Sequence, residues 1–316
     1  ANFGETLQGP VADVVVRNWG VLITLMGGML IYAAFNPSVR VFAITVAGIS
    51  KLFFAMAVFG HGGRFLGHQA AIAATIDLLS QGRLDLGIGK GYRFNEFKGF
   101  GIPMEEAESR FEECVEVMLK SWTSEGNFTH KGRHWTFEDV VVEPPPFQKP
   151  HPMLWMGAGS PTSIKRVAER GMGLLLDQFA PHTTILERVE LFKSECARVG
   201  RTFDPMQVGV ARAVYICDTV EEKERVLAAR MSSKAKQSEL AQRPDGQNKS
   251  SIMSYDDSRE TAEAGALFGT VDEIAAKLRY LHDGGVRYIL LNIGAAGPGG
   301  RDITRRFAKE IMPQLA

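Results

Sequence analysis

The chain has 316 residues, enough for one α/β barrel of about 250 residues or for two ordinary domains. Its 36 basic and 36 acidic residues give a formal net charge of zero, and no basic run indicates a nucleic-acid partner. Cys114, Cys196 and Cys217 form no CxxC pair, and no His, Cys or carboxylate cluster has metal-ligand spacing, which excludes a disulfide framework and predicts no metal site. A reducing, cytoplasmic compartment is the expectation.

Two apolar runs lie near the N-terminus. Residues 20–35 are uncharged, and residues 41–60 are interrupted only by Lys51. The first is shorter than the ~18 residues of a typical membrane span, and the second would span only if the lysine were tolerated. The runs fit a membrane hairpin, or they fit buried core strands and helices, which also lack charge on both faces. Residues 1–10 have neither the basic start nor the apolar core of a signal peptide.

Strand-like runs alternate with amphipathic helices from about residue 51 onward, which is typical of βαβ units and a parallel sheet. The predicted strands are 52–59, 83–89, 153–157, 173–176, 207–216 and 286–293. The predicted helices are 69–80, 105–121, 163–171, 183–199 and 272–284, and a small β excursion is expected within 127–142. Residues 231–266 are polar and weakly periodic, which predicts a functional lid or a disordered segment.

Glycines surround the end of the strand predicted at 83–89. Gly82 is expected to end the preceding helix, because only glycine enters the left-handed region without a Cβ penalty. Gly89 and Gly91 let the backbone approach a ligand at the strand's C-terminal end, where α/β barrels keep their chemistry, and Lys90 places a cation there. The alternative is a glycine-rich surface turn that carries a lysine.

A second strand exit combines glycines with hydroxyls before a helix. Gly157, Gly159, Ser160 and Ser163 lie between the strand 153–157 and the helix 163–171. Free N–H groups at a helix start suit a phosphate. The alternative is ordinary N-capping by Thr162 or Ser163.

Two further side chains are candidates. Arg110 follows a glycine-rich segment in the first turns of the helix 105–121, where a surface ion pair is the alternative to ligand binding. His61 directly follows the strand predicted at 52–59, so it is a catalytic candidate whose alternative is a structural role.

Taken in order, these segments resemble the bacterial luciferase-like flavin oxidoreductases. The resemblance rests on DLLSQGR at 77–83, LGIGKG at 86–91, FKGFGIPMEEAESR at 97–110 and EPPPFQKPHP at 143–152. It extends over roughly residues 50–230 and, more weakly, 267–295. The expected second-strand exit, an acidic residue followed by histidines, is absent, and residues 1–50 depart from the family pattern.

The resemblance implies a (β/α)8 TIM barrel over residues 1–316 that binds FMN at its C-terminal face, with 231–266 as a polar lid. It implies that Lys90 and Arg110 are cations near the flavin phosphate and that Ser160 and Ser163 are its hydroxyl contacts. Two cations, two hydroxyls and a helix N-terminus also suit a dianionic phosphate on chemical grounds.

The implied activity is a monooxygenase reaction in which reduced FMN, supplied by a separate flavin reductase, and O2 oxygenate a small organic substrate. The expected enzyme is a cytoplasmic homodimer. Three alternatives remain open: an F420-dependent hydride-transfer oxidoreductase of the same superfamily, a non-catalytic flavin-binding protein, and a membrane-attached fusion.

Overall fold

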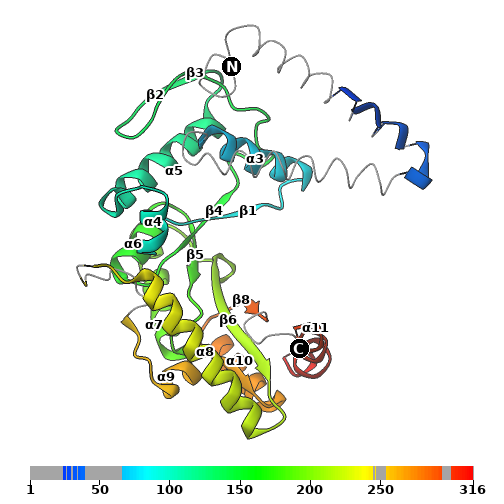
Figure 1. Ribbon diagram of the computed structural model, residues 1–316, viewed down its shortest axis with the longest axis vertical. Coiled ribbons are helices and arrows are strands. Elements are labelled where there is room, and N and C mark those ends of the chain that lie inside the picture. Colours follow the sequence, from blue (N-terminus) through cyan, green and yellow to red (C-terminus); the bar gives the residue numbers. More distant parts are fainter. Residues whose placement is uncertain are drawn as a thin grey trace. The chain divides into compact units, whose positions relative to one another are not determined.

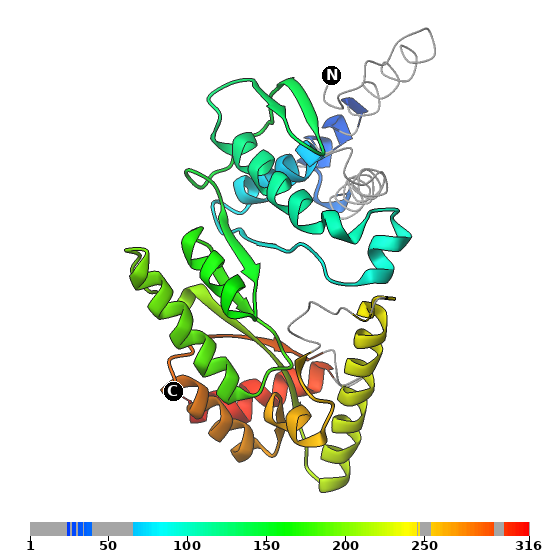
Figure 2. The same ribbon diagram turned by 90° about the vertical axis from the view of Figure 1, so that its left-hand side faces the viewer.

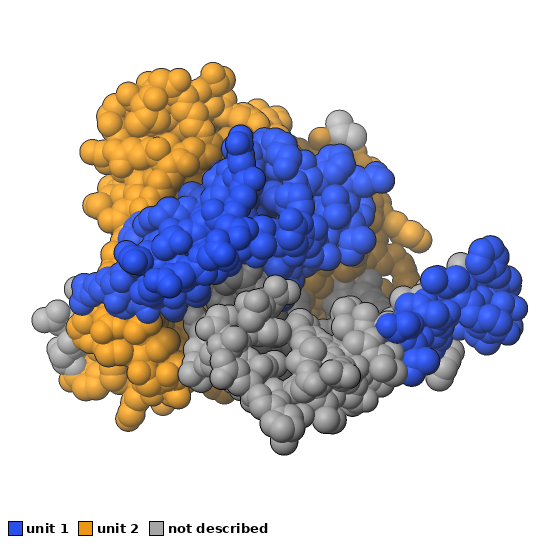
Figure 3. All heavy atoms as spheres, turned by 90° about the horizontal axis from the view of Figure 1, so that it is seen from above, with its two compact units in different colours: residues 1–84, 112–152 blue, residues 85–111, 153–316 orange. Residues whose placement is uncertain are grey.

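The computed structural model describes residues 24–25, 27–29, 31–33, 35–39, 66–244, 246, 254–293 and 300–315. The chain divides into two compact units, which Figure 3 shows in different colours. Unit 1 comprises residues 1–84 and 112–152, and unit 2 comprises residues 85–111 and 153–316. The strand expected at 52–59 and the candidate His61 lie outside the described residues, and the single domain stays a prediction.

Unit 1 combines helices with a small antiparallel sheet. Helix α3 (Leu66–Leu79) and most of α5 (Ala107–Thr123) are followed by a hairpin of β2 (Phe128–Lys131) and β3 (Thr136–Val140) (Figure 1). This hairpin confirms the predicted β excursion. After α3 the chain reverses at Gly82, whose φ of +79° is in the left-handed region, and a Cβ there would lie 2.8 Å from the Phe147 ring.

Buried polar groups hold the loops of unit 1. Asp77 at the end of α3 is fully buried, and its carboxylate accepts hydrogen bonds of 2.8 Å from both the backbone N and the Nε2 of Gln148. The Trp122 indole Nε1 donates to the Ala70 carbonyl at 3.0 Å, which ties α5 to α3. The sequence pattern gave no indication that Asp77 would be a core residue.

Removing the Asp77 carboxylate is expected to destabilise unit 1. Asp77→Ala leaves the Gln148 backbone N–H without its acceptor, whereas the Gln148 Nε2 amide keeps the Leu84 carbonyl at 2.8 Å. We therefore expect the free energy of unfolding to fall by about 2 kcal/mol. Urea unfolding of the wild type and the variant measures this loss. Glu125→Ala, which removes an exposed carboxylate of the same unit, is the control and is expected to stay within about 0.5 kcal/mol of the wild type.

Unit 2 is built on a six-stranded parallel sheet. The strands are β1 (Asp85–Ile88), β4 (Met153–Gly157), β5 (Gly173–Leu176), β6 (Val208–Ile216), β7 (Leu267–Gly269) and β8 (Tyr288–Asn292). They pair in the order β1-β4-β5-β6-β7, and β8 pairs with β6. The α/β class with a parallel sheet is thus confirmed. The described strands do not show a closed eight-stranded barrel, which stays a prediction.

Helices connect and cover these strands. They are α4 (Phe94–Gly99), α6 (Pro161–Glu169), α7 (His182–Arg198), α8 (Val220–Ala241), α9 (Arg259–Ala264), α10 (Val271–Asp283) and α11 (Gly300–Arg306). Short helical turns occupy Met104–Glu106, Pro205–Gln207, Phe307–Ile311 and Met312–Gln314. The predicted strands and helices from residue 69 onward are present, apart from shifts of a few residues at their ends.

The strand sequences explain the packing of the sheet. Leu174, Leu176, Val208 and Val210 are at most 2% exposed, as expected for continuous apolar runs in a parallel sheet. On β5, Gly173 leaves room for an aromatic ring, because a Cβ there would lie 2.5 Å from the indole of Trp155. Farther along β6, Val214 and Ile216 pack in a cluster with apolar residues of α10 and α11. This apolar cluster extends the core toward the C-terminal end of β6.

The polar segment predicted as a lid is partly regular helix. Residues 231–241 continue α8, which Figure 2 shows as an uninterrupted yellow helix, and residues 259–264 form α9. The apolar periodicity of α8 is weak because its packed face buries Arg230 and Lys234 as well as Val226 and Leu227. Residues 231–241 are therefore ordered helix and not a disordered segment, and the role of 231–266 as a lid stays a prediction.

Only part of the first N-terminal apolar run belongs to the described residues, where short stretches between 24 and 39 are helical. The second run, 41–60, lies outside them. Within the described ranges, none of the helices has both the length and the apolar character that crossing a membrane requires.

Candidate functional site

Two of the predicted strand exits lie side by side. β1 and β4 are parallel neighbours, and Ile88 is paired with Met156. The chain therefore leaves the sheet at Gly89 and at Gly157 in adjacent positions. A Cβ at either glycine would meet no described atom within 4 Å, so the backbone borders open space at both exits. Gly91 has a φ of +77°, which explains the glycine at that position.

The exit from β4 leads into the capped start of α6. Ser160 is the N-cap: its Oγ accepts from the Ser163 backbone N at 3.3 Å, while the Ser163 Oγ accepts from the Ser160 backbone N at 3.1 Å. Pro161 occupies the first turn, where its missing N–H is not needed. N-capping is therefore real, but the capping residue is Ser160, and the alternative that named Thr162 or Ser163 as the cap is wrong. Gly159 lies directly before this cap.

A carboxylate joins the two exits. The Glu108 Oε2 atom accepts from the Lys90 Nζ at 2.5 Å, and the Glu108 Oε1 atom accepts from the Arg166 Nη1. Lys90 follows β1, Glu108 lies near the start of α5, and Arg166 lies one turn after Ser163 on α6. The Lys90 ammonium lowers the pKa of Glu108, with a smaller contribution from the Arg166 guanidinium. Glu108 thus links the predicted cation Lys90 to α6.

Arg110, in the first turn of α5, pairs with the helical turn that precedes the helix. Its side chain forms an ion pair with Glu106 at 2.8 Å, one turn earlier in the chain. The structure thus shows the ion pair that was the alternative interpretation, and a phosphate contact by Arg110 stays a prediction.

These residues fit a phosphate group. Lys90, which follows β1, and Arg166 of α6 already share one oxyanion, and the serine-capped start of α6 follows β4, the parallel neighbour of β1. The side chains of Lys90 and Arg166 are 47% and 37% exposed, so a ligand from solvent can reach them. Lys90, Arg166, Ser160 and Ser163 are the residues that could hold it.

A second polar cluster lies at the C-terminal end of β5. The Asp177 Oδ1 atom accepts from the backbone N atoms of Phe179 and Ala180, at 2.8 and 3.0 Å. The Asp177 Oδ2 atom accepts from Arg188 of α7 at 3.0 Å and from the hydroxyl of Tyr255 at 2.8 Å. Burial and the neighbouring Asp177 raise the pKa of Tyr255, which therefore stays a neutral donor. This cluster joins segments 78 residues apart, and the sequence analysis did not find it.

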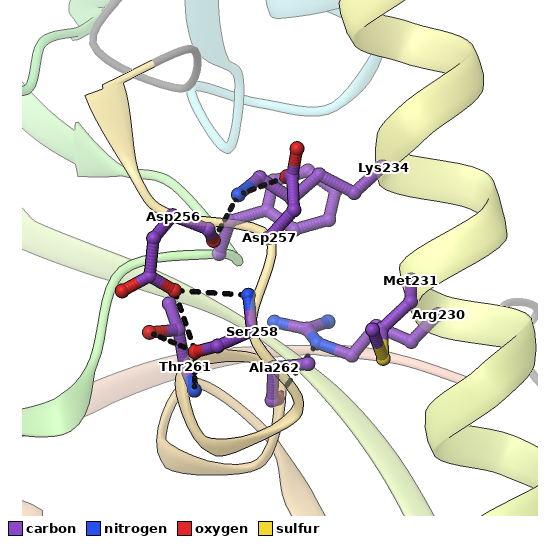
Figure 4. Close-up of a pocket in the computed structure, with 9 residues that line it drawn as sticks. Arg230, Met231, Lys234, Asp256, Asp257, Ser258, Thr261 and Ala262 are labelled. Carbon is purple, nitrogen blue, oxygen red and sulfur yellow. Dashed lines mark hydrogen bonds and ion pairs between the residues drawn. The ribbon is translucent and has the colours of Figure 1, made fainter.

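Two basic residues of α8, Arg230 and Lys234, extend toward the segment from Asp256 to Ala262, as Figure 4 shows. The Arg230 guanidinium donates to the carbonyls of Gln178, Ala262 and Gly265 and lies over the Phe179 ring. Burial lowers the pKa of Arg230 to about 10. One turn further along α8, Lys234 donates to the carbonyls of Tyr255 and Asp256 and pairs with Asp257 at 2.8 Å. A pocket lies between these residues of α8 and the segment from Asp256 to Ala262. Both cations donate hydrogen bonds to backbone carbonyls, so a structural role accounts for their burial.

Two buried basic side chains carry atoms that have no hydrogen-bond partner among the described residues, although the Arg212 Nη1 atom donates to the Asp177 carbonyl at 2.9 Å. The Nε and Nη2 atoms of Arg212, on β6, and the Nε2 atom of His182, at the start of α7, have no hydrogen-bond partner among the described residues. Burial lowers the pKa of Arg212 to about 10. Burial lowers the pKa of His182 to about 3, with further contributions from Arg212, Lys277 and Arg230. His182 is therefore neutral in the folded protein at neutral pH.

The neutral His182 predicts a loss of stability in acid. Its folded pKa of about 3 lies below the ordinary 6.5, so the unfolded chain binds the extra proton between these values. This contribution is complete above pH 6.5 and is lost toward pH 3, with a slope of about 1.4 kcal/mol per pH unit. Urea unfolding between pH 7 and 5 should show a shallower loss for His182→Gln than for the wild type. His282→Gln, which changes an exposed histidine, should keep the wild-type slope.

Comparisons with known proteins identify the family of this chain. The sequence profile of the luciferase-like monooxygenases matches residues 67–288, more than half of the chain. The chain is 30% identical over 158 residues to the FMNH2-dependent dimethylsulfone monooxygenase of Pseudomonas putida, a match that covers 49% of this chain and 42% of that protein. The chain spans between 42% and 61% of the length of three curated relatives that it matches.

Solved structures share the fold. The monooxygenase RslO1 from Streptomyces bottropensis superposes with a TM-score of 0.61 at 27% identity, covering 79% of this chain and 74% of that one. An F420-dependent secondary alcohol dehydrogenase also superposes with a TM-score of 0.61, at 18% identity, covering 79% of this chain and 75% of that one. The family match over residues 67–288 contains both strand exits and the residues that border them. On the strength of this match, the chain belongs to the luciferase-like monooxygenase family.

Proposed function

We propose that this protein is a flavin-dependent monooxygenase that uses reduced FMN and O2 to oxygenate a small organic substrate. The observation that carries the proposal is the Glu108 carboxylate bound by both Lys90 and Arg166, the latter on the helix whose start Ser160 caps. Two cations, two hydroxyls and a helix start on segments that follow neighbouring strands support a site for a flavin phosphate. The family and the FMNH2-dependent relative support FMN as the cofactor.

The residues of this site would bind and orient the cofactor. Lys90 and Arg166 would neutralise the phosphate charge, and the Ser160 and Ser163 hydroxyls would donate hydrogen bonds to its oxygens. The glycines Gly89 and Gly157 would let the ring system pass close to the two strand ends. Reduced flavin supplies the oxygen-activating chemistry when bound, and the protein contributes position and exclusion of water.

Other parts of the proposal concern the whole enzyme. They include closure of the sheet into a TIM barrel, a homodimer in the cytoplasm and a separate reductase that supplies the reduced flavin. His61 is kept as a candidate for a catalytic role because of its position in the sequence. The other candidate is F420-dependent hydride transfer, which the shared fold of the alcohol dehydrogenase allows and which would use the same cations for its phosphate.

A cofactor titration tests the proposal. The purified full chain is titrated with FMN, riboflavin and F420 while ligand fluorescence is recorded. We expect micromolar binding of FMN and much weaker binding of riboflavin, followed by O2 consumption when reduced FMN is supplied with candidate substrates. Selective binding of F420 would replace the monooxygenase with the hydride-transfer enzyme. Binding of neither cofactor would contradict both.

A further inference from the structure

Glu108 occupies the site at which a phosphate would bind. Its two carboxylate oxygens are each used by a different cation: one accepts from Lys90 at the end of β1, and the other accepts from Arg166 on α6. The three side chains come from three separate elements and are between 37% and 47% exposed. The two N–H donors that bind the Glu108 carboxylate oxygens could equally bind two oxygens of a phosphate group.

The exchange of one anion for the other costs little. Ion pairs at this degree of exposure contribute little to stability, because solvent screens them. A phosphate dianion carries more charge than a carboxylate and accepts more hydrogen bonds, which the Ser160 and Ser163 hydroxyls at the start of the same helix could supply. The phosphate is therefore the stronger ligand for Lys90 and Arg166, and Glu108 is the weaker one.

We propose that Glu108 is an internal substitute for the cofactor phosphate, which holds Lys90 and Arg166 together in the ligand-free protein and is displaced when the phosphate binds. The inference rests on the proposed function, because it assumes a phosphate-bearing flavin. It assigns Arg166 as a phosphate-binding cation, which the sequence analysis did not single out. Arg166 lies three residues after Ser163, so the two share one face of α6.

Glu108→Gln tests the displacement. The amide keeps the size of the side chain but removes the charge that competes for the two cations and repels the phosphate. We expect the Kd for FMN to fall roughly threefold to tenfold, which is the effect of removing one weak competing ion pair. The Kd for riboflavin, which has no phosphate, should not change. Glu116→Gln removes a carboxylate that pairs with Lys120 two turns further along α5, and it should leave both constants unchanged.

Arg166→Gln tests the additional cation. Loss of a charge-assisted hydrogen bond to the phosphate should raise the Kd for FMN roughly tenfold and leave that for riboflavin unchanged. Lys165→Gln changes the adjacent, exposed cation of α6 and is the matched control. Thermal unfolding of each variant verifies that the fold is retained before the titrations are compared.

The outcomes separate this inference from the proposed function. If the wild type binds FMN no better than riboflavin, the phosphate site itself is wrong and both proposals fail. If the wild type prefers FMN but Glu108→Gln leaves its Kd unchanged or raises it, the phosphate site stands and the displacement by Glu108 is wrong. An unchanged Kd for FMN in Arg166→Gln would overturn the role assigned to Arg166.

Discussion

Lys90→Gln is expected to raise the Kd for FMN by roughly 30-fold to 100-fold and to leave the Kd for riboflavin unchanged. Lys90 extends from the end of β1 and already binds an oxyanion, the Glu108 carboxylate, at 2.5 Å. Glutamine has a similar length but no charge, so the variant loses a charge-assisted hydrogen bond to the phosphate, worth about 2–3 kcal/mol. Fluorescence titration of the full chain with both flavins measures the two constants.

The matched control for this change is Lys98→Gln. Lys98 lies in the last turn of α4, eight residues after Lys90, and its loss should leave both flavin constants as in the wild type. An equal weakening of FMN and riboflavin by Lys90→Gln would mean that the lysine acts on the ring system or on folding. A Kd for FMN within twofold of the wild type would show that Lys90 does not bind the phosphate.

Much of this site could be predicted from the sequence because its signals are local. The left-handed Gly82, the glycines around Lys90 and the serines at the start of α6 each have a role that follows from neighbouring residues. Parallel pairing of β1 with β4 then brings two separate motifs to the same edge of the sheet. The alternation of strands and helices in the sequence was therefore sufficient to predict that Lys90 and Ser163 belong to one site.

The parts that were missed depend on contacts between distant segments. Glu108 is one of several acidic residues around the start of α5, and nothing in the neighbouring sequence distinguishes it as the one that joins Lys90 to Arg166. The three-residue β7 is too short for a periodic pattern to identify it. In α8 the buried charges of Arg230 and Lys234 look like a solvated face in the sequence, although tertiary contacts bury them.

Asp177→Ala is expected to lower the free energy of unfolding of unit 2 by about 3–5 kcal/mol. The Asp177 carboxylate accepts four hydrogen bonds, two from the loop that follows β5, one from Arg188 and one from Tyr255. Alanine would leave these donors unpaired, and it would also remove the negative charge that stabilises the buried cations Arg212 and Arg230. Urea and thermal unfolding, followed by circular dichroism, measure the loss.

Two milder variants separate the causes of this loss. Asp177→Asn keeps an oxygen acceptor for the backbone donors but removes the charge, so it should lose about half as much stability as Asp177→Ala. Tyr255→Phe removes only one donor and should cost about 1 kcal/mol, because the carboxylate keeps its three other partners. If Asp177→Ala were within about 1 kcal/mol of the wild type, other contacts would have to hold the β5–α7 loop, and Arg188 would be expected to form a new ion pair.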